Sequence, residues 1–268
     1  ERGSWPWRRC SDLWAKMRPG DGIEQHCVQI DRCNQRGGRM LSIVDLIDAG
    51  TFSRELAAYA LAAISRGASF LVGANPGGAG KTTVMGALLN FVPADVELAA
   101  AADSAAIRDG LACPAPRRCY ICHEIGRGHW FGYLWGRELR DYFELPTAGH
   151  MLATNLHADT LDEARDQIVG QNGVPEDAFR RMSLAFFLHL ASGPFRRKRQ
   201  IAGAWEADGD GPHRDVIDDL SRSRLVPPDR LGRARAVIDE IVASGGRTIR
   251  DVRRAVLEQE DTLNGGNI

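Results

Sequence analysis

The stretch Phe70-Leu-Val-Gly-Ala-Asn-Pro-Gly-Gly-Ala-Gly-Lys-Thr-Thr83 carries the strongest structural signal in the 268-residue sequence. Its first three residues form a short continuous apolar run, which predicts a buried parallel strand. The glycines that follow let the backbone curl so that successive N–H groups face inward. The segment from Lys81 to about Asn90 predicts a helix. A strand, a glycine-rich loop and a helix N-terminus in this order predict a cradle for phosphate groups.

The predicted phosphate loop consists of nine residues, which are Asn75, Pro76, Gly77, Gly78, Ala79, Gly80, Lys81, Thr82 and Thr83. In the pattern G-x-x-x-x-G-K-[ST], the lysine reaches the β- and γ-phosphates and the next hydroxyl ligates Mg²⁺. We therefore predict ATP and Mg²⁺ as cofactors, with Lys81 on the phosphates and Thr82 on the metal. The usual first glycine falls on Asn75, and asparagine tolerates left-handed backbone better than most residues. The alternative is a glycine-rich turn that binds nothing.

Strand-like and helix-like patterns alternate through the middle of the chain. Buried strands are expected at 70–72, 96–101, 119–122 and 151–155, and helices at 81–90, 136–144 and 160–169, the last capped by Asp159. This alternation predicts an α/β fold with a mostly parallel sheet. Outside this section we expect a helix from Ser53 to about 66, a hairpin of 184–190 with 200–205, and helices at 230–243 and 248–260.

The domain organisation follows from where these patterns change. We expect an irregular segment over residues 1–40, a nucleotide-binding core over 41–207 and a helical C-terminal region over 208–268, with helical character from Asp215 onward. The first residue is Glu1, and we expect that the natural start of the chain lies upstream.

The charge and composition limit the function classes. Thirty-four basic and 35 acidic residues leave a net charge of −1, so no whole-protein attraction to nucleic acid or anionic membrane is expected. No apolar run approaches the roughly 18–20 residues of a membrane span, and the N-terminus has no signal-peptide pattern. Six cysteines are too few for a disulfide scaffold. We predict reduced cysteines and a cytoplasmic protein.

Four blocks of sequence resemble one known family, the type II/type IV secretion traffic ATPases. The blocks are Leu41–Tyr59, the phosphate loop, Tyr120-Ile-Cys-His-Glu-Ile125 and Ala148-Gly-His-Met-Leu-Ala-Thr-Asn-Leu-His-Ala158. The third is similar to the family's Walker B strand, which ends in Gly-Glu-Ile, and the fourth to its His box. The resemblance covers roughly residues 41–260 and is nearest to the archaeal and conjugation-type branch.

This resemblance implies a RecA-like P-loop core with a small helical C-terminal region. It implies an ATP-hydrolysing motor for pilus assembly, pilus retraction or secretion, with nucleotide bound between the subunits of a homo-hexamer. A membrane-embedded secretion or pilus platform protein is the implied partner, which would place the chain at the inner face of the cell membrane. Nucleic acid is not an expected partner.

The same resemblance suggests roles for individual residues. Glu124 matches the catalytic glutamate, His150 and His157 match the two histidines of the His box, and Asp103 matches an aspartate that binds Mg²⁺ through water. For His157 the implied role is contact with the γ-phosphate, whereas His150 is expected to be structural or to lie at an interface. The alternatives are a capping or ion-paired Glu124, a helix-capping Asp103 and a structural His157.

Several departures from the family pattern favour a second hypothesis. Ala102 stands in place of a glutamate, His123 in place of the Walker B glycine, and residues 126–132 look like an insertion. In the family a sensing domain precedes the segment that matches Leu41–Tyr59, and we expect it to be short or missing in this sequence. Ala102 and His123, together with Asn75 in the phosphate loop, favour a degenerate regulatory subunit with little turnover. A third hypothesis is a DNA-handling P-loop ATPase, whose activity nucleic acid would stimulate.

Other candidate features remain open in the sequence. An arginine acting in trans could be Arg54, Arg117, Arg127 or Arg137. A zinc site at Cys10, Cys27 and Cys33 with His26 is an alternative to free buried thiols. Cys119 and Cys122 lie three apart on an expected strand, so they should face opposite sides. The cluster Arg196–Arg199 is expected at a solvated hairpin tip, with anionic lipid or nucleic acid as the alternative contact.

Overall fold

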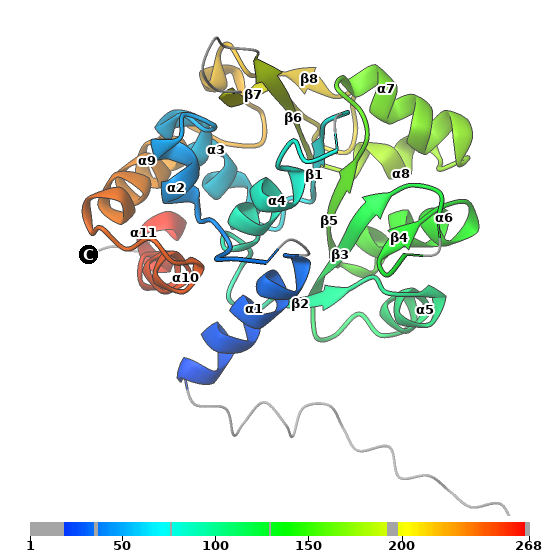
Figure 1. Cartoon of the computed structure of the whole chain (residues 1–268), viewed down its shortest axis with the longest axis horizontal. Helices are drawn as coiled ribbons and strands as arrows, with labels where there is room; N and C mark the ends of the chain where they lie inside the picture. Colours follow the sequence, from blue (N-terminus) through cyan, green and yellow to red (C-terminus); the bar gives the residue numbers. More distant parts are fainter. Residues whose placement is uncertain (1–18, 35–36, 76, 129, 192–197, 266–268) are drawn as a thin grey trace, which may run out of the picture.

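A mostly parallel sheet organises the computed structural model, which describes residues 19–34, 37–75, 77–128, 130–191 and 198–265 (Figure 1). Its strands are β1 (Phe70–Gly73), β2 (Glu97–Ala100), β3 (Arg118–Ile125), β4 (Tyr133–Leu134), β5 (Met151–Leu156), β6 (Leu184–Ala191), β7 (Lys198–Glu206) and β8 (Arg214–Asp215). They follow the order β2-β3-β5-β1-β6-β7-β8, with β4 beside β3. The β6–β7 and β7–β8 pairs are antiparallel, and the other pairs of described strands are parallel. The predicted α/β fold with a mostly parallel sheet is confirmed.

Helices cover both faces of this sheet (Figure 1). They are α1 (Pro19–Cys33), α2 (Ile43–Asp48), α3 (Arg54–Ile64), α4 (Lys81–Leu89), α5 (Ser104–Ala112), α6 (Arg137–Glu144), α7 (Leu161–Arg165), α8 (Glu176–Arg180), α9 (Pro228–Ala243), α10 (Ile249–Glu258) and α11 (Glu260–Asn264). Two predicted caps at the N-terminal ends of helices are confirmed. The Ser53 hydroxyl accepts a hydrogen bond from the Leu56 N–H at 3.1 Å, and Thr248 with Asp251 forms a capping box at the start of α10.

The sheet separates two apolar clusters, and β1 lies at its centre between β5 and β6. Cys119 belongs to one cluster and Cys122 to the other, as their spacing on a strand predicts. All four residues of β1 are buried, and α4 is buried along most of its length. Because a helix that is apolar on every side has to lie inside the protein, the segments flanking the glycine-rich loop are both held firmly in place.

Three expectations about local structure are wrong. Residues 19–33 form α1 rather than irregular chain, because the buried side chains of Cys27, Ile30 and Cys33 give this segment an apolar face against the core. The chain after Asp215 forms only a 3₁₀ turn at Leu220–Arg222 and no α-helix before α9. The cap of α7 is Thr160, whose hydroxyl accepts from the Glu163 N–H, rather than Asp159.

The C-terminal helices share the core of the nucleotide-binding section. Apolar side chains of α9 and α10 belong to the same cluster as those of α3 and α4. Arg230, only 4% exposed, donates from Nε to the Ala62 carbonyl oxygen at 2.9 Å and from Nη1 to that of Leu263 at 2.7 Å. These bonds join α9 to the end of α3 and to α11. The division of the chain into three parts at residues 40 and 207 stays a prediction.

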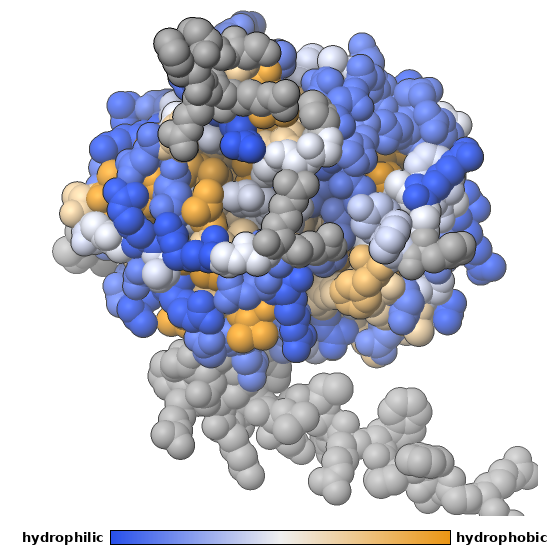
Figure 2. Space-filling view, in the orientation of Figure 1, coloured by the Kyte–Doolittle hydropathy of each residue, from blue (hydrophilic) through white to orange (hydrophobic). Residues whose placement is uncertain are grey.

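The molecular surface is mainly hydrophilic on the face shown in Figure 2, where apolar residues appear in small separate groups. Among the described residues, the exposed large apolar side chains are those of Leu41, Trp130 and Phe131. None of the described helices combines the length and the apolar character needed to cross a lipid bilayer.

Candidate nucleotide site

The glycine-rich loop joins the end of β1 to the first turn of α4, as the sequence predicts. Gly78 and Gly80 have φ angles of 83° and 110°, in the left-handed region that favours glycine. Gly80 is also the residue that precedes α4. No described residue other than glycine has a positive φ, so Asn75 does not need the left-handed backbone that its side chain tolerates. Pro76 lies outside the described residues.

Asn75 is instead held by the segment that follows β5. Its backbone N–H donates to Asp159 Oδ1 at 2.7 Å, and its side-chain amide lies 3.4 Å from Glu163 Oε2. Gly73, at the start of this turn, has no room for a larger residue, because an added Cβ would lie 2.6 Å from the Ala158 carbonyl oxygen. The entry to the loop is therefore fixed by close packing against residues 158–163.

Lys81 lies at the end of the loop with its ammonium group buried. Its Nζ donates to the Ala74 carbonyl oxygen at 3.1 Å and lies 3.4 Å from Glu124 Oε2. Burial lowers the pKa of Lys81, and the neighbouring Glu124 carboxylate opposes that shift. The lysine that the sequence assigns to phosphate therefore contacts the carboxylate that the resemblance assigns to catalysis.

Glu124 reaches this position through an irregularity in β3. The β3–β5 register shifts between Cys122 and Ile125, and Asn155 of β5 donates from Nδ2 to the His123 carbonyl oxygen at 2.9 Å. Bulges of this kind re-aim side chains near functional sites. Glu124 is 8% exposed, and its Oε1 has no hydrogen-bond partner among the described residues. Burial raises the pKa of Glu124, against the charges of Lys81 and His157.

His157 completes the cluster from the loop that follows β5. Its Nδ1 lies 2.8 Å from the Asn75 carbonyl oxygen and 3.2 Å from Lys81 Nζ. Its Nε2 lies 3.9 Å from Glu124 Oε2 and 3.5 Å from Lys81 Nζ. The side chain is about half exposed. The structure thus brings together the lysine, the glutamate and the second histidine of the predicted site.

His150, the other histidine of the His box, has a structural position. Its Nδ1 accepts from the Arg118 N–H at 3.1 Å and its Nε2 lies 3.0 Å from the Gly110 carbonyl oxygen. The ring is buried and packs edge-on against Tyr120. These contacts join the starts of β3 and β5 to α5.

Asp103 caps α5. Its Oδ1 accepts from the N–H groups of Ala105 and Ala106, both at 2.9 Å. The helix-capping alternative is therefore what the structure shows, while a contact to metal through water stays a prediction. Thr82 is half-buried in the first turn of α4, beside Lys81.

The four candidate arginines have different surroundings. Arg54 pairs with Asp239 at 2.7 Å, and Arg117 lies 3.3 Å from Asp95. Arg127 lies over the ring of Trp135, 5.1 Å from its centroid. Arg137 lies 3.8 Å from Asp141, and its side chain is more exposed than those of Arg54 and Arg117. An action in trans by any of them stays a prediction.

The cysteines give no support to a zinc site within the described residues. Cys27 and Cys33 are buried free thiols on α1, and burial raises their pKa values to about 11 and about 12. His26 Nε2 lies 3.0 Å from the Leu89 carbonyl oxygen. No group of three metal-binding side chains occurs in the described part of the chain. Cys10 lies outside it, as do Arg196 and Arg197 of the basic cluster.

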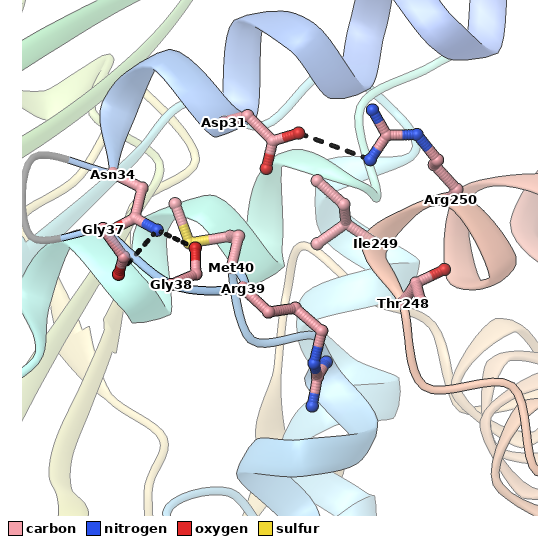
Figure 3. Close-up of a pocket in the computed structure, with 9 residues that line it drawn as sticks. All are labelled: Asp31, Asn34, Gly37, Gly38, Arg39, Met40, Thr248, Ile249 and Arg250. Atoms are coloured by element: carbon pink, nitrogen blue, oxygen red, sulfur yellow. Dashed lines mark hydrogen bonds and ion pairs between the residues drawn. The ribbon is translucent and has the colours of Figure 1, made fainter.

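A separate cavity of about 400 Å³ lies between the end of α1 and the start of α10 (Figure 3). Arg250 of α10 reaches Asp31 of α1 across it at 3.3 Å, and Asn34 bonds the carbonyl oxygens of Gly37 and Gly38. Both arginines that line the cavity, Arg39 and Arg250, already pair with carboxylates. The cavity shares no residue with the phosphate loop, so it is a feature of the α1–α10 contact.

Three contacts of the loop and of His157 could not be found by sequence motifs. Asp159 was expected to cap a helix and instead binds Asn75. Gln167 donates to the His157 carbonyl oxygen from the π-helical turn after α7. Arg199, expected at a hairpin tip, lies on β7 and donates to the loop carbonyl oxygens of Ala79 and Gly78. The glycine-rich pattern indicates that other residues must hold the loop in place, but no motif identifies which residues these are.

Comparisons with known proteins place two solved structures near this chain. The VirB11 ATPase of the Brucella suis type IV secretion system, solved with sulphate, has a TM-score of 0.43 at 17% identity over 78% of this chain. The Legionella pneumophila ATPase DotB has a TM-score of 0.37 at 12% identity over 81%. The chain spans 67% and 60% of the lengths of those two proteins. No protein-family model and no curated protein matches the sequence.

Proposed function

We propose that this chain binds Mg-ATP on residues 75–83 and hydrolyses it, as the motor ATPase of a type II/type IV secretion or pilus-type system. The observation that supports ATP hydrolysis is that two buried groups of opposite charge lie close together. Lys81 at the end of a glycine-rich loop lies 3.4 Å from Glu124 at the end of β3, at the carboxyl edge of a parallel sheet. Ligands of open α/β sheets bind at that edge.

The cluster contains the groups that phosphoryl transfer to water requires. Hydrolysis needs a positioned water and stabilisation of charge on the transferring group. Glu124, with a raised pKa and an unpartnered Oε1, is suited to accept a proton from that water. Lys81 supplies the positive charge once it leaves Glu124 for the phosphates. His157 presents Nε2 to the same space.

The residues present suit a magnesium ion carried by the nucleotide. Mg²⁺ keeps several waters and takes few protein ligands when it is bound with phosphates. Thr82 would hold it through its hydroxyl, and the unpartnered Glu124 Oε1 is a suitable acceptor for one of its waters. The ion would supply neutralisation of phosphate charge.

The assembly part of the proposal comes from the four sequence blocks. They imply a homo-hexamer with nucleotide at the subunit interface, where an arginine of the next subunit completes the site. They also imply work on a membrane-embedded platform protein from the inner face of the membrane. Sedimentation with and without Mg-ATP tests the ring directly.

Replacement of Lys81 by alanine tests nucleotide binding and turnover together. The substitution removes the only lysine of the loop, and with it the charge that attracts the β- and γ-phosphates. We expect phosphate release from Mg-ATP to fall to background, about 10²-fold or more below wild type, as for loss of one preorganised electrostatic contact. Equal phosphate release by wild type and Lys81→Ala, measured at a concentration that allows assembly, would contradict the proposal.

The pH profile of turnover should reflect the environment of Glu124. As a general base it acts only when deprotonated, so activity falls as the pH drops through its pKa. Burial raises that pKa while Lys81 and His157 lower it. When Lys81 moves to the phosphates this lowering weakens, so the acid limb of kcat should lie at higher pH than that of kcat/KM. Steady-state rates from pH 4.5 to 9, with Glu124→Gln as the control, would measure both acid limbs. Acid limbs of kcat and kcat/KM at the same pH would contradict this prediction.

A regulatory subunit with little turnover is the second candidate. The observation that favours it is the use of Asp103 as a helix cap, which engages Oδ1 of the carboxylate that the resemblance assigns to metal. Tight ATP binding by wild type without phosphate release distinguishes this candidate from the motor.

A further inference from the structure

Arg199 contacts the phosphate loop from a strand 120 residues further along the chain. It lies on β7 opposite Leu190 of β6. Its Nε donates to the Ala79 carbonyl oxygen at 2.9 Å, and its Nη2 lies 3.4 Å from the Gly78 carbonyl oxygen. Its Cδ lies 3.3 Å from the place where a Cβ on Gly80 would be. The guanidinium thus covers one side of three consecutive loop residues.

The two carbonyl groups fix the direction of two amide groups. A trans peptide unit points its C=O and its N–H to opposite sides. The unit that carries the Gly78 oxygen also carries the Ala79 N–H, and the unit that carries the Ala79 oxygen also carries the Gly80 N–H. With both oxygens turned toward Arg199, both N–H groups face away from it. Neither of these two N–H groups has a backbone acceptor among the described residues.

The glycine content of the loop means that a contact which restrains its backbone can affect nucleotide affinity. Glycine populates many backbone conformations, and Gly77, Gly78 and Gly80 lie in this short stretch. A free loop would therefore lose conformational entropy when its N–H groups converge on phosphate oxygens. A restraint that holds them in that arrangement beforehand reduces this loss.

The charge of Arg199 acts in the same direction. Among the described residues its hydrogen bonds go to loop carbonyl oxygens, with no carboxylate partner. Hydrogen bonds from a charged donor are stronger than neutral ones. A cation at the oxygen end of a peptide dipole also makes the N–H end more attractive to an anion, which is the property of a backbone nest.

We propose that Arg199 is a positioning residue of the phosphate loop, which holds the Ala79 and Gly80 N–H groups toward the α- and β-phosphates of the bound nucleotide. The inference rests on the proposed function, because it presumes that the loop binds a nucleotide. It differs from direct contact with the terminal phosphate. Loop N–H groups serve the α- and β-phosphates, so Arg199 should matter equally for ADP and ATP.

The test compares nucleotide affinities of Arg199→Gln, Arg199→Lys and wild type by titration calorimetry. We expect Arg199→Gln to raise the Kd values of ADP and Mg-ATP by the same factor, about tenfold, which is the lower range for a hydrogen bond to a charged group. Arg199→Lys keeps the positive charge but loses the guanidinium that reaches two carbonyl oxygens. Its Kd values should therefore lie between those of wild type and Arg199→Gln. Lys198→Gln is the matched control, because Lys198 is the preceding residue of β7 and approaches Gly50 instead.

A second measurement separates positioning from a merely structural role. Amide hydrogen exchange in nucleotide-free protein should become faster in Arg199→Gln over residues 77–80 and stay unchanged in β6, β7 and α4, with an unchanged melting temperature. Loss of ATP affinity alone, or unchanged Kd values in Arg199→Gln, would overturn the inference and leave the proposed function intact. Failure of wild type to bind either nucleotide would overturn both.

Discussion

Replacement of Glu124 by glutamine is expected to lower ATP turnover by about 10²–10⁴-fold, the range of general-base catalysis. Glutamine keeps the shape of the side chain but cannot accept a proton from water. Binding should survive, because Lys81 loses its 3.4 Å ion-pair partner and is freer to contact phosphate. Phosphate release at saturating Mg-ATP gives the first quantity, and calorimetric titration of Glu124→Gln with Mg-ATP gives the second.

The control for this prediction is a carboxylate outside the cluster. Glu176 pairs with Arg165 at 2.7 Å on the surface, and Glu176→Gln should leave turnover unchanged. If Glu124→Gln retained wild-type turnover, the proton acceptor would be another group and the assignment of β3 as the catalytic strand would fail. If it lost both turnover and binding, its role would be to maintain the loop.

The second large effect concerns stability and centres on Glu206 of β7. This carboxylate is fully buried and accepts from the Tyr59 hydroxyl at 2.8 Å, the Ser223 hydroxyl at 2.5 Å and the Arg224 N–H at 2.7 Å. It also pairs with Arg214 at 3.1 Å. Glu206→Ala would leave these donors without their acceptor. We expect a loss of about 3–5 kcal/mol in the free energy of unfolding.

Urea unfolding of nucleotide-free protein at fixed concentration measures this loss. The matched control is Asp239→Ala, which removes an ion pair with Arg54 that is about half exposed on both sides. It should cost less than about 1 kcal/mol. Glu206→Gln, which keeps an acceptor oxygen, should lie between the two. Similar midpoints for Glu206→Ala and Asp239→Ala would show that the buried network contributes no more than a surface pair.

Much of the phosphate loop was predictable because its signals are local. An apolar run of three residues predicts β1, and Gly78 and Gly80 occupy the two left-handed positions that the loop requires. The apolar segments 119–122 and 151–155 likewise predict β3 and β5. By contrast, α1 was missed, because glycines and polar residues obscure the few apolar positions that it buries.

What the sequence by itself determined is the α/β fold, the phosphate loop and Lys81, since each depends on a pattern within a short segment, while the resemblance of two further segments to a known family suggested Glu124 and His157. The tertiary structure alone decided that these three side chains meet, because the sheet order places β5 between β1 and β3. It alone decided that Asp159 and Arg199 hold the loop from 84 and 120 residues away. Contacts between distant segments depend on how whole strands pack, and no local pattern records that packing.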